Sequence, residues 1–369
     1  MRIIMSGGGT GGHIYPAITI IRAIQKQVQS CEVLFVGTQH GLEYDIIPKE
    51  GFELSTIDVR GFERRLSVQN VLTIIKTVGS VWQARQIISK FKPDIVIGTG
   101  GYVCGPVLLA ASLMGIPTMI QEQNVIPGIT NKILARFVDK IAVGYAEAKG
   151  YFSHQEKVFT SGNPIRPEVV FATRDEGVTA LGLDPAKRTI LISGGSRGAR
   201  SINQAMIQVH QQFAGRQDVQ LLHVTGQSEY NDIVGKLKQC CIDTTKAGNI
   251  IIKPYLYNMP QALATADIAI FRAGAVGLAE LTARGVPSIL IPYPFAAENH
   301  QEFNARVMEK QGAAVVIRDT ELNGTRLVEA INDLVNSPQK LDAMAAASKK
   351  IGCPEAAERI AQMALTMIR

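Results

Sequence analysis

Short apolar segments, each followed by a glycine-containing turn and an amphipathic stretch, recur along the whole chain. Continuous apolar runs of this length are typical of parallel strands that are buried on both faces. Regular alternation of such strands with helices predicts an α/β fold with doubly wound parallel sheets. Strands are expected at residues 2–6, 32–37, 95–99, 118–121, 140–143, 189–193, 220–225, 250–253, 268–271, 288–292 and 314–317. Helices are expected at residues 16–27, 72–89, 200–213, 259–265, 277–284 and 301–311.

The two halves of the chain echo each other. Residues 3–12 (IIMSGGGTGG) resemble residues 190–199 (ILISGGSRGA), and 369 residues exceed what one ordinary core accommodates. We therefore expect two Rossmann-like domains, 1–163 and 164–344, facing a cleft, with the boundary in a segment rich in proline and glycine. The amphipathic segment 345–369 is expected to be helical and to pack back on the first domain.

The composition places few limits on function. Hydrophobic residues make up 46% and charged residues 19%, which excludes extended disorder. Lysine and arginine exceed aspartate and glutamate by 38 to 32, a mild excess that suits acidic ligands or an anionic membrane but is also common in ordinary enzymes. The five cysteines form no CxxC pair or zinc-ligand spacing, which favours free thiols in a reducing compartment. The first residues carry no secretory pattern, so we expect a cytoplasmic protein.

No charged residue occurs between Asp94 and Glu122, a stretch long enough to span a bilayer. Its seven glycines and prolines divide it into strand, glycine loop, helix, turn and strand. We therefore interpret it as a buried βαβ unit and not as a transmembrane helix.

The glycine-rich run at residues 7–13 (GGGTGGH) carries the strongest functional signal. Glycines let the backbone approach a ligand closely with its N–H groups inward, and a following helix, expected from Pro16, adds a positive dipole end. The run does not match the P-loop pattern, and a tight turn without a ligand is the alternative. His13 closes the run and can act as a general base, although a histidine that only hydrogen-bonds the backbone fits equally well.

Further glycine turns follow other predicted strands. Residues 98–102 (GTGGY) would add a second anion-binding turn to the first domain, which suggests a pyrophosphate acceptor beside the base. In the second domain, the turn 194–198 (GGSRG) precedes a helix, and residues 273–276 would point N–H groups at a phosphate. Glu280 lies one helical turn further on and can accept from ribose hydroxyls, or it can be an ordinary surface glutamate. The loop 292–301 carries amide side chains that suit sugar hydroxyls.

Taken together, these motifs resemble the MurG family of UDP-N-acetylglucosamine transferases, which act on undecaprenyl-pyrophosphoryl-N-acetylmuramoyl-pentapeptide. The resemblance rests on GGTGGH at 8–13 with Pro16, EQN at 122–124 with Gly128 and Asn131, GNPIR at 162–166, GGSRGA at 194–199, RAGA at 272–275 with Glu280, and HQ at 300–301 with Asn304 and Ala305. It implies the GT-B fold, with the acceptor in the first domain and UDP-N-acetylglucosamine mainly in the second.

The resemblance also implies roles for individual residues. His13 and Glu122 would lie near the reacting hydroxyl, with His13 as the candidate base. Gly100, Gly101 and Tyr102 would meet the acceptor pyrophosphate. The donor would be contacted by Thr10, Gly11, Gly12, Asn124, Arg166, Ser196, Leu256, Ala275, Val276, Gly277, Leu278, Ala279, Glu280 and Gln301, with Glu280 on the ribose and Gln301 on the transferred sugar. Gln121 and Gly277 depart from the family, which often has histidine and threonine or serine there.

The implied reaction is a single inverting displacement that contributes to peptidoglycan synthesis. No cofactor is implied, and because the chain has no Asp-x-Asp motif we expect no metal requirement. A lipid-linked acceptor requires peripheral contact with the anionic inner membrane from the cytoplasmic side. The segment 71–88 offers an apolar stripe of Leu72, Ile75, Val78, Val81 and Trp82 beside Arg64, Arg65, Lys76 and Arg85, although core packing would explain it equally well. No nucleic-acid partner is expected.

Three alternative functions stay open at this level. A UDP-N-acetylglucosamine 2-epimerase shares the two-domain plan but needs no acceptor. A diacylglycerol glycosyltransferase would use a different lipid, and a non-catalytic binder of nucleotide sugars would turn over neither substrate.

Overall fold

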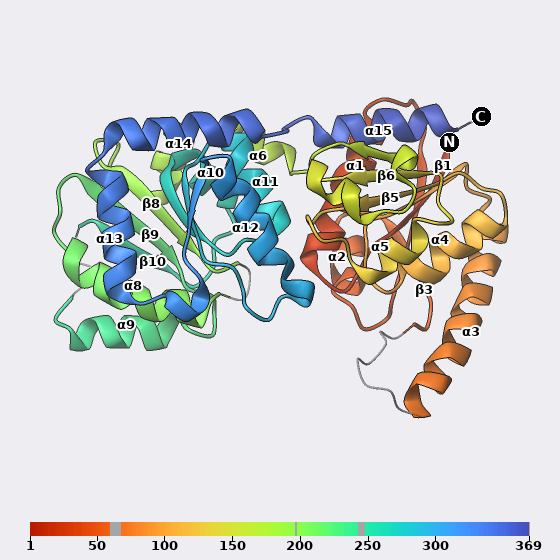
Figure 1. The fold of residues 1–369 in the computed structure, drawn as a ribbon, viewed down its shortest axis with the longest axis horizontal. Coiled ribbons are helices and arrows are strands. Elements are labelled where there is room, and N and C mark those ends of the chain that lie inside the picture. The colour runs from red at the N-terminus through yellow and green to blue at the C-terminus, as the bar shows by residue number, and fades with distance from the viewer. Residues whose placement is uncertain (60–67, 196–197, 243–247, 369) are drawn as a thin grey trace. The chain divides into compact units, whose positions relative to one another are not determined.

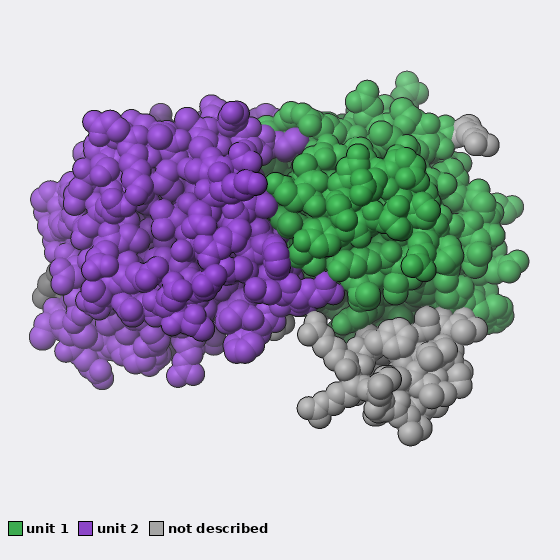
Figure 2. Space-filling model, viewed as in Figure 1, with its two compact units in different colours: residues 1–165, 354–369 green, residues 166–353 purple. Residues whose placement is uncertain are grey.

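The computed structural model describes residues 1–59, 68–195, 198–242 and 248–368, and for residues 68–78 it describes the backbone alone. The chain divides into two units, each with its own sheet and core (Figures 1 and 2). Unit 1 comprises Met1–Ile165 and Pro354–Arg369, and unit 2 comprises Arg166–Cys353.

Unit 1 contains a seven-stranded parallel sheet in the order β3-β2-β1-β4-β5-β6-β7. Its strands are β1 (Arg2–Ser6), β2 (Glu32–Gly37), β3 (Glu53–Thr56), β4 (Ile95–Gly98), β5 (Thr118–Glu122), β6 (Lys140–Val143) and β7 (Val158–Thr160). Its helices are α1 (Gly11–Gln25), α2 (Glu43–Lys49), α3 (Val68–Phe91), α4 (Cys104–Leu113), α5 (Ile129–Leu134) and α15 (Ala356–Met367), with short 3-10 helices η1 (Ala146–Tyr151) and η2 (Gln155–Lys157).

Unit 2 contains a six-stranded parallel sheet in the order β10-β9-β8-β11-β12-β13. Its strands are β8 (Arg188–Ser193), β9 (Val219–Val224), β10 (Ile250–Lys253), β11 (Ala266–Phe271), β12 (Ser288–Leu290) and β13 (Ala314–Val316). Its helices are α6 (Pro167–Phe171), α7 (Arg174–Leu181), α8 (Arg200–Phe213), α9 (Tyr230–Gln239), α10 (Met259–Thr265), α11 (Ala275–Arg284), α12 (His300–Lys310), α13 (Gly324–Val335) and α14 (Pro338–Ile351), with η3 (Ala297–Asn299) and η4 (Asp319–Glu321).

The prediction of two doubly wound parallel sheets is confirmed. All the expected strands occur within two residues of their expected bounds, and two strands, β3 and β7, were not expected. Both are edge strands whose residues are half-buried or exposed, so neither carries the continuous apolar run that marks a strand covered on both faces.

The core of unit 1 lies on both faces of its sheet. Along β1, Ile3 and Met5 belong to one buried cluster with α1 and α15, whereas Ile4 belongs to the cluster on the other face with α3 and α4. Alternation of this kind follows from the two-residue side-chain period of a strand.

The C-terminal segment 345–369 includes two helices instead of one. Its beginning is the end of α14, which packs against α11 and α13 in unit 2, and α15 packs against α1 in unit 1 (Figure 1). Gly352 ends α14, and a Cβ atom there would lie 2.5 Å from the carbonyl oxygen of Thr282.

Three helices begin two or more residues earlier than expected. Helix α3 starts at Val68 and not at residue 72. Helix α1 starts at Gly11 inside the glycine run, with Thr10 as its N-cap, and Pro16 lies within the helix. Helix α11 starts at Ala275 and not at residue 277. The expected starts of α1 and α11 relied on proline at the first helical position and on glycine as a helix breaker, but the turns after β1 and β11 close within a few residues.

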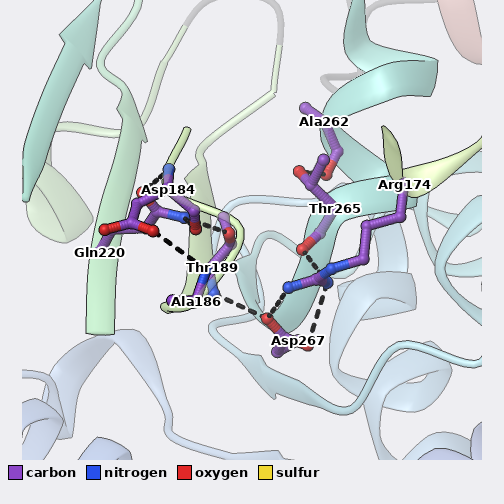
Figure 3. Close-up of polar contacts among 8 residues, drawn as sticks. All are labelled: Arg174, Asp184, Ala186, Thr189, Gln220, Ala262, Thr265 and Asp267. Atoms are coloured by element: carbon purple, nitrogen blue, oxygen red, sulfur yellow. Dashed lines mark hydrogen bonds and ion pairs between the residues drawn. The ribbon is translucent and has the colours of Figure 1, made fainter. Parts of the chain in front are cut away.

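At the amino ends of the strands of unit 2, a polar network fixes α7 to the sheet (Figure 3). The guanidinium of Arg174 donates to the carbonyl of Thr265 at 2.9 Å and to both carboxylate oxygens of Asp267 at 3.1 and 3.2 Å. Asp267 Oδ2 also accepts from the N–H of Thr189 at 2.7 Å, and Gln220 Nε2 donates to the Thr189 hydroxyl at 3.0 Å. This network lies at the edge opposite to the glycine turns, so we regard it as structural.

Candidate active site

Four helices begin at the carboxyl ends of the parallel strands, directly after the glycine turns: α1 and α4 in unit 1, and α8 and α11 in unit 2. None of the four has a side-chain N-cap or an acidic residue in its first turn. The first N–H groups of a helix carry partial positive charge and need a partner from outside the helix. Each unit therefore presents two helix ends that suit anionic groups such as phosphates.

The glycine run of residues 7–10 is anchored by a residue that the sequence did not indicate. Glu43 on α2 is 1% exposed, and its carboxylate accepts from the N–H of Gly9 at 2.9 Å and from the N–H and hydroxyl of Thr38 at 3.0 and 2.7 Å. Burial alone would raise the pKa of Glu43, but these hydrogen bonds outweigh burial and lower it. Because Glu43 lies on a short helix far from the glycine run in sequence, no local sequence pattern indicates that it contacts the run.

His13 lies in the first turn of α1, and its ring is held by the backbone. Its Nδ1 lies 3.0 Å from the carbonyl oxygen of Gly8 and 3.4 Å from the hydroxyl of Thr10. Because a carbonyl only accepts, the shorter contact requires the proton on Nδ1, which leaves Nε2 of the neutral ring as an acceptor. Nε2 lies beside Gly100, where a Cβ atom would be only 3.0 Å away. The geometry therefore selects the tautomer that a general base needs.

The second glycine turn packs directly on the first. Gly100 and Gly101 have φ of +109° and +89°, and the N–H of Gly8 donates to the carbonyl of Gly100 at 3.3 Å. The N–H of Gly100 points at the buried Cys104 sulfur, 3.2 Å away, and therefore has a partner inside the protein. In the described part of the chain, the N–H groups of Gly101 and Tyr102 have no such partner, and the Tyr102 side chain is exposed.

Glu122 ends β5 and organises the loop after it. One carboxylate oxygen accepts from the backbone N–H and the side-chain amide of Asn124, at 2.9 and 3.2 Å. The other accepts from the N–H of Gly128 at 3.1 Å and from the side-chain amide of Asn131 at 2.8 Å. Glu122 as a whole is 2% exposed. The four hydrogen bonds to its carboxylate hold Asn124 in place.

In unit 2, Arg166 and Glu280 form an ion pair. Arg166 Nε and Nη2 donate to Glu280 Oε1 at 3.1 and 3.0 Å, and Glu280 is 8% exposed. Burial raises the pKa of Glu280, and the charge and hydrogen bonds of Arg166 partly oppose that rise. Glu280 lies on α11 below its uncapped first turn, so it is a buried group at the site and not an ordinary surface glutamate.

Arg272 connects several loops at the carboxyl edge of the second sheet. The sequence motif at 272–275 includes Arg272 but did not predict a role for it. Its guanidinium donates to the carbonyls of Ile291 and Pro292, to Asp319 at 2.5 Å and to the Ser201 hydroxyl at 2.8 Å. It therefore fixes the start of α8 relative to the loop that carries Gln301. Gln301 Oε1 in turn accepts from the N–H of Tyr293 at 2.9 Å.

The predicted site residues gather at the carboxyl edges of the two sheets. Unit 1 brings together the turns of residues 7–13 and 100–102, because the turns contact each other directly. Unit 2 places Arg166 against Glu280 and presents the first turn of α11, whereas Leu256 follows β10 and is buried. Ser196 lies outside the described residues. Within the described ranges, no three histidine, cysteine or acidic side chains are grouped so as to hold a metal ion.

Two family models match the chain: the glycosyltransferase family 28 N-terminal domain over residues 3–143 and the glycosyltransferase family 28 C-terminal domain over residues 189–360. The chain belongs to glycosyltransferase family 28. The resemblance inferred from the motifs is thereby confirmed, as is the GT-B type of fold.

Two curated relatives of this family 28 chain carry the same name, UDP-N-acetylglucosamine–N-acetylmuramyl-(pentapeptide) pyrophosphoryl-undecaprenol N-acetylglucosamine transferase. The one from Desulforamulus reducens is 48% identical over 356 residues, 96% of each chain, and the one from Moorella thermoacetica is 47% identical over 368 residues, 100% of this chain and 99% of the relative.

Solved structures give the same picture of the fold. The crystal structure of Acinetobacter baumannii MurG is similar with a TM-score of 0.79 and 26% identity over 99% of each chain. A UDP-GlcNAc 2-epimerase from Neisseria meningitidis reaches a TM-score of 0.69 at 14% identity, covering 99% of this chain and 100% of the epimerase. At that identity, the epimerase shows only that the fold is shared.

Proposed function

We propose that this chain transfers N-acetylglucosamine from UDP-N-acetylglucosamine to the lipid-linked acceptor undecaprenyl-pyrophosphoryl-N-acetylmuramoyl-pentapeptide. The near full-length identity of 46–49% to relatives that carry this activity in their names supports the assignment. The single structural observation that carries it is the His13 ring, whose Nδ1 is bound to Gly8 and whose Nε2 is an acceptor beside two uncapped helix ends.

The reaction is a direct displacement. His13 Nε2 takes the proton of the 4-hydroxyl of N-acetylmuramic acid, and the hydroxyl oxygen bonds to the anomeric carbon of the donor. The bond from that carbon to the UDP oxygen breaks, the electron pair leaves with UDP, and an α-linked donor yields a β-linked product. General base catalysis of this kind contributes about 10²- to 10⁴-fold to the rate.

Unit 2 binds the leaving group. The first N–H groups of α11, at Ala275, Val276 and Gly277, donate to the diphosphate, and their fixed orientation stabilises the charge that grows on UDP. The positions Leu278 and Ala279 continue this helix toward Glu280, which accepts from the ribose hydroxyls. Its present partner Arg166 opposes the rise in pKa that burial causes and so favours the charged carboxylate. Gln301 contacts the transferred sugar, and Leu256 contacts the uridine of the donor through its main chain.

Gly277 needs no side chain for this role. A Cβ atom there would meet nothing within 4 Å, so the family's usual threonine or serine would fit, and its absence leaves the backbone N–H groups as the donors.

Unit 1 binds the acceptor. The N–H groups of Gly101 and Tyr102, at the start of α4, donate to the acceptor pyrophosphate, and Gly100 brings this turn against His13. The four hydrogen bonds to Glu122 favour a positioning role, through Asn124, over a second base. Thr10, Gly11, Gly12 and Asn124 also contact the donor in this proposal, as the resemblance implies.

We also propose peripheral attachment to the inner membrane on its cytoplasmic side. Among the described helices, none is both long and apolar enough to cross a bilayer. In the stripe predicted on α3, Trp82 is 62% exposed, whereas Leu72, Ile75, Val78 and Lys76 lie where the structure describes only the backbone, and Arg64 and Arg65 lie outside the described residues. Leu113 at the end of α4 is 72% exposed, and Leu113, Met114, Ala110, Val81 and Arg85 line a groove of about 330 Å³ between α3 and α4. Exposed apolar side chains beside arginine suit an anionic interface.

The experiment combines purified protein, UDP-N-acetylglucosamine and the lipid-linked acceptor, and it follows UDP release and the disaccharide product. We expect release that depends on the acceptor. Conversion of the nucleotide sugar without any acceptor would identify an epimerase instead, and turnover with diacylglycerol alone would identify a lipid glycosyltransferase of another kind.

A further inference from the structure

In the part of unit 1 that the structure describes, α5 and the turn after it carry a row of apolar side chains that are largely exposed. Ile129 and Ile133, four residues apart and therefore on one side of the helix, are 59% and 56% exposed. Phe137, in the turn that follows the helix, is 42% exposed. Together with Leu113 we call these residues the α5 strip. Single exposed apolar residues are ordinary, but an aligned series of them indicates a binding surface.

One end of the α5 strip lies at the turn proposed for the acceptor pyrophosphate. A Cβ atom at Gly105 would lie 3.6 Å from the Thr130 side chain, next to Ile129. The N–H of Gly105 donates to the carbonyl of Tyr102, whose own side chain is 57% exposed. The apolar face therefore begins beside Tyr102.

The other end lies at the surface proposed for membrane attachment. The Ser112 hydroxyl donates to the carbonyl of Phe137 at 2.8 Å, which brings Phe137 next to Leu113. Leu113 also lines the groove between α3 and α4, where Val81 precedes the exposed Trp82. From Ile129 to Ile133 the helical part of the strip extends about 6 Å, because a helix rises 1.5 Å per residue.

We propose that the α5 strip binds the isoprenoid chain of the acceptor, specifically the first isoprene units after the pyrophosphate. This inference rests on the proposed function. A lipid whose pyrophosphate is bound at residues 100–102 and whose tail remains in the bilayer crosses the surface between those two places, and the α5 strip provides the apolar route. The charged residues between 128 and 138, Lys132 and Arg136, are both basic, which suits a lipid with an anionic head.

The test compares acceptors that differ only in isoprenoid length, assayed in detergent with the double variant Ile129→Ser/Ile133→Ser. Serine and isoleucine have similar helix propensity, so replacement at these exposed positions leaves α5 intact. For long-tailed acceptors we expect KM to rise about tenfold, the effect of exposing part of two apolar contacts. For an acceptor with a very short tail, KM should change less than about twofold, and kcat and the KM for UDP-N-acetylglucosamine should stay unchanged.

The matched control is Ile129→Val/Ile133→Val, which keeps the surface apolar and should retain the wild-type KM for every tail. A Trp82→Ser variant separates the strip from membrane attachment, because it should weaken binding to anionic phospholipid vesicles and leave the dependence on tail length in detergent unchanged.

The proposal is overturned if the double serine variant raises KM equally for short and long tails, or changes KM for neither. It is also overturned if the variant only weakens vesicle binding, as Trp82→Ser does, because the strip would then contact bulk lipid. Failure of the proposed function would be distinct, since the wild-type protein would then turn over no acceptor of any length.

Discussion

At the residue scale, the candidate base depends on positions where no side chain fits. A Cβ atom at Gly7 would lie 2.1 Å from the Thr99 hydroxyl, and one at Gly101 would lie 2.5 Å from the carbonyl oxygen of Gly8. The Gly8 carbonyl in turn accepts from His13. Glycines in these turns therefore allow the two loops to touch and to hold the imidazole between them.

Replacement of Gly100 by alanine tests this arrangement. The new Cβ atom would lie 2.9–3.0 Å from the His13 ring, at a φ of +109° that alanine rarely adopts. We expect Gly100→Ala to lower kcat by about 10²-fold, because displacement of a catalytic group by about 1 Å has an effect of that size. Steady-state kinetics with saturating donor and acceptor would measure it.

Gly115→Ala is the matched control for that variant. Gly115 has a φ of +73° but open space around the position of a Cβ atom, so alanine there carries a backbone cost without a clash. Gly115→Ala should lose only the small free energy of unfolding that the backbone cost implies, and only Gly100→Ala should lose activity. Equal activity in the two variants would show that Gly100 does not position His13.

Two buried histidines in unit 2 form a second hydrogen-bonded set, away from the candidate base. His210 Nε2 lies 3.0 Å from His223 Nδ1, and His223 Nε2 lies 3.0 Å from Asn203 Oδ1. Asn203 Nδ2 donates to the carbonyl of Thr225, so its oxygen accepts, which places a proton on His223 Nε2. If His223 is neutral, its Nδ1 accepts from His210 Nε2. Burial lowers the pKa of His210 to about 4 and lowers that of His223 well below its usual value.

These shifts predict a loss of stability in acid. As the pH falls below about 6.5, the unfolded chain binds a proton at His210 while the folded chain does not, so the free energy of unfolding decreases. The decrease continues until the folded chain also binds the proton near pH 4 and amounts to about 3 kcal/mol for His210 alone.

His210→Gln removes this titration and keeps an N–H donor for His223. Between pH 7.5 and pH 5 in urea, we expect the variant to lose about 2 kcal/mol less stability than the wild type. The control variant is His40→Gln, because His40 is exposed. It should show the same change in the free energy of unfolding between these two pH values as the wild type. The same acid dependence in His210→Gln and the wild type would contradict this assignment.

At the scale of elements, α1, α4, α8 and α11 have no side-chain N-cap, as is true of most of the described helices, whereas α7 and α13 are capped. Helix α7 begins with a capping box between Thr173 and Glu176, and α13 begins with the Asn323 side chain on the N–H of Arg326. A side-chain cap stabilises a helix by about 1 kcal/mol. In α1, α4, α8 and α11, which follow glycine turns at the carboxyl ends of parallel strands, the N–H groups left without a side-chain cap suit an anionic ligand.

The network that anchors α7 gives a prediction about stability alone. Arg174→Ala removes three hydrogen bonds to Thr265 and Asp267 and should lower the free energy of unfolding by about 1–3 kcal/mol. Because these contacts lie at the amino ends of the strands, kcat should stay unchanged. Chemical denaturation and the transferase assay would measure the two quantities.

Arg359→Ala serves as its control, because Arg359 pairs with Glu355 where both side chains are 52% exposed. Exposed pairs of this kind contribute about 0–1 kcal/mol. An Arg174→Ala variant as stable as Arg359→Ala would show that the network adds little to the anchoring of α7.

The sequence predicted buried elements better than exposed ones. Central strands such as β1 and β8 are buried at every residue but the first and were predicted within one residue. The edge strands β3 and β7 were missed, and the starts of α1 and α11 were placed too late. Helix starts inside glycine runs depend on how tightly the preceding turn closes, which tertiary contacts such as Gly9 with Glu43 decide.

At the scale of the whole molecule, the motifs predicted which residues matter but not how the protein holds them. His13 and Glu280 were predicted from their place after glycine turns, yet Glu43, Ser201 and Asp319 carry no local pattern. Each of these three contacts a site element distant in sequence, so only the folded chain brings them to it. The Gly100–His13 contact is likewise a consequence of strand order, because β4 lies next to β1.

The most direct test of the account is the rate of sugar transfer by His13→Ala in a single turnover, with donor affinity measured by calorimetry on the same protein. We expect the rate to fall by about 10²- to 10⁴-fold while the Kd for UDP-N-acetylglucosamine changes less than about twofold. A transfer rate close to that of the wild type would contradict it, because the imidazole held between the two glycine turns would then not be the base.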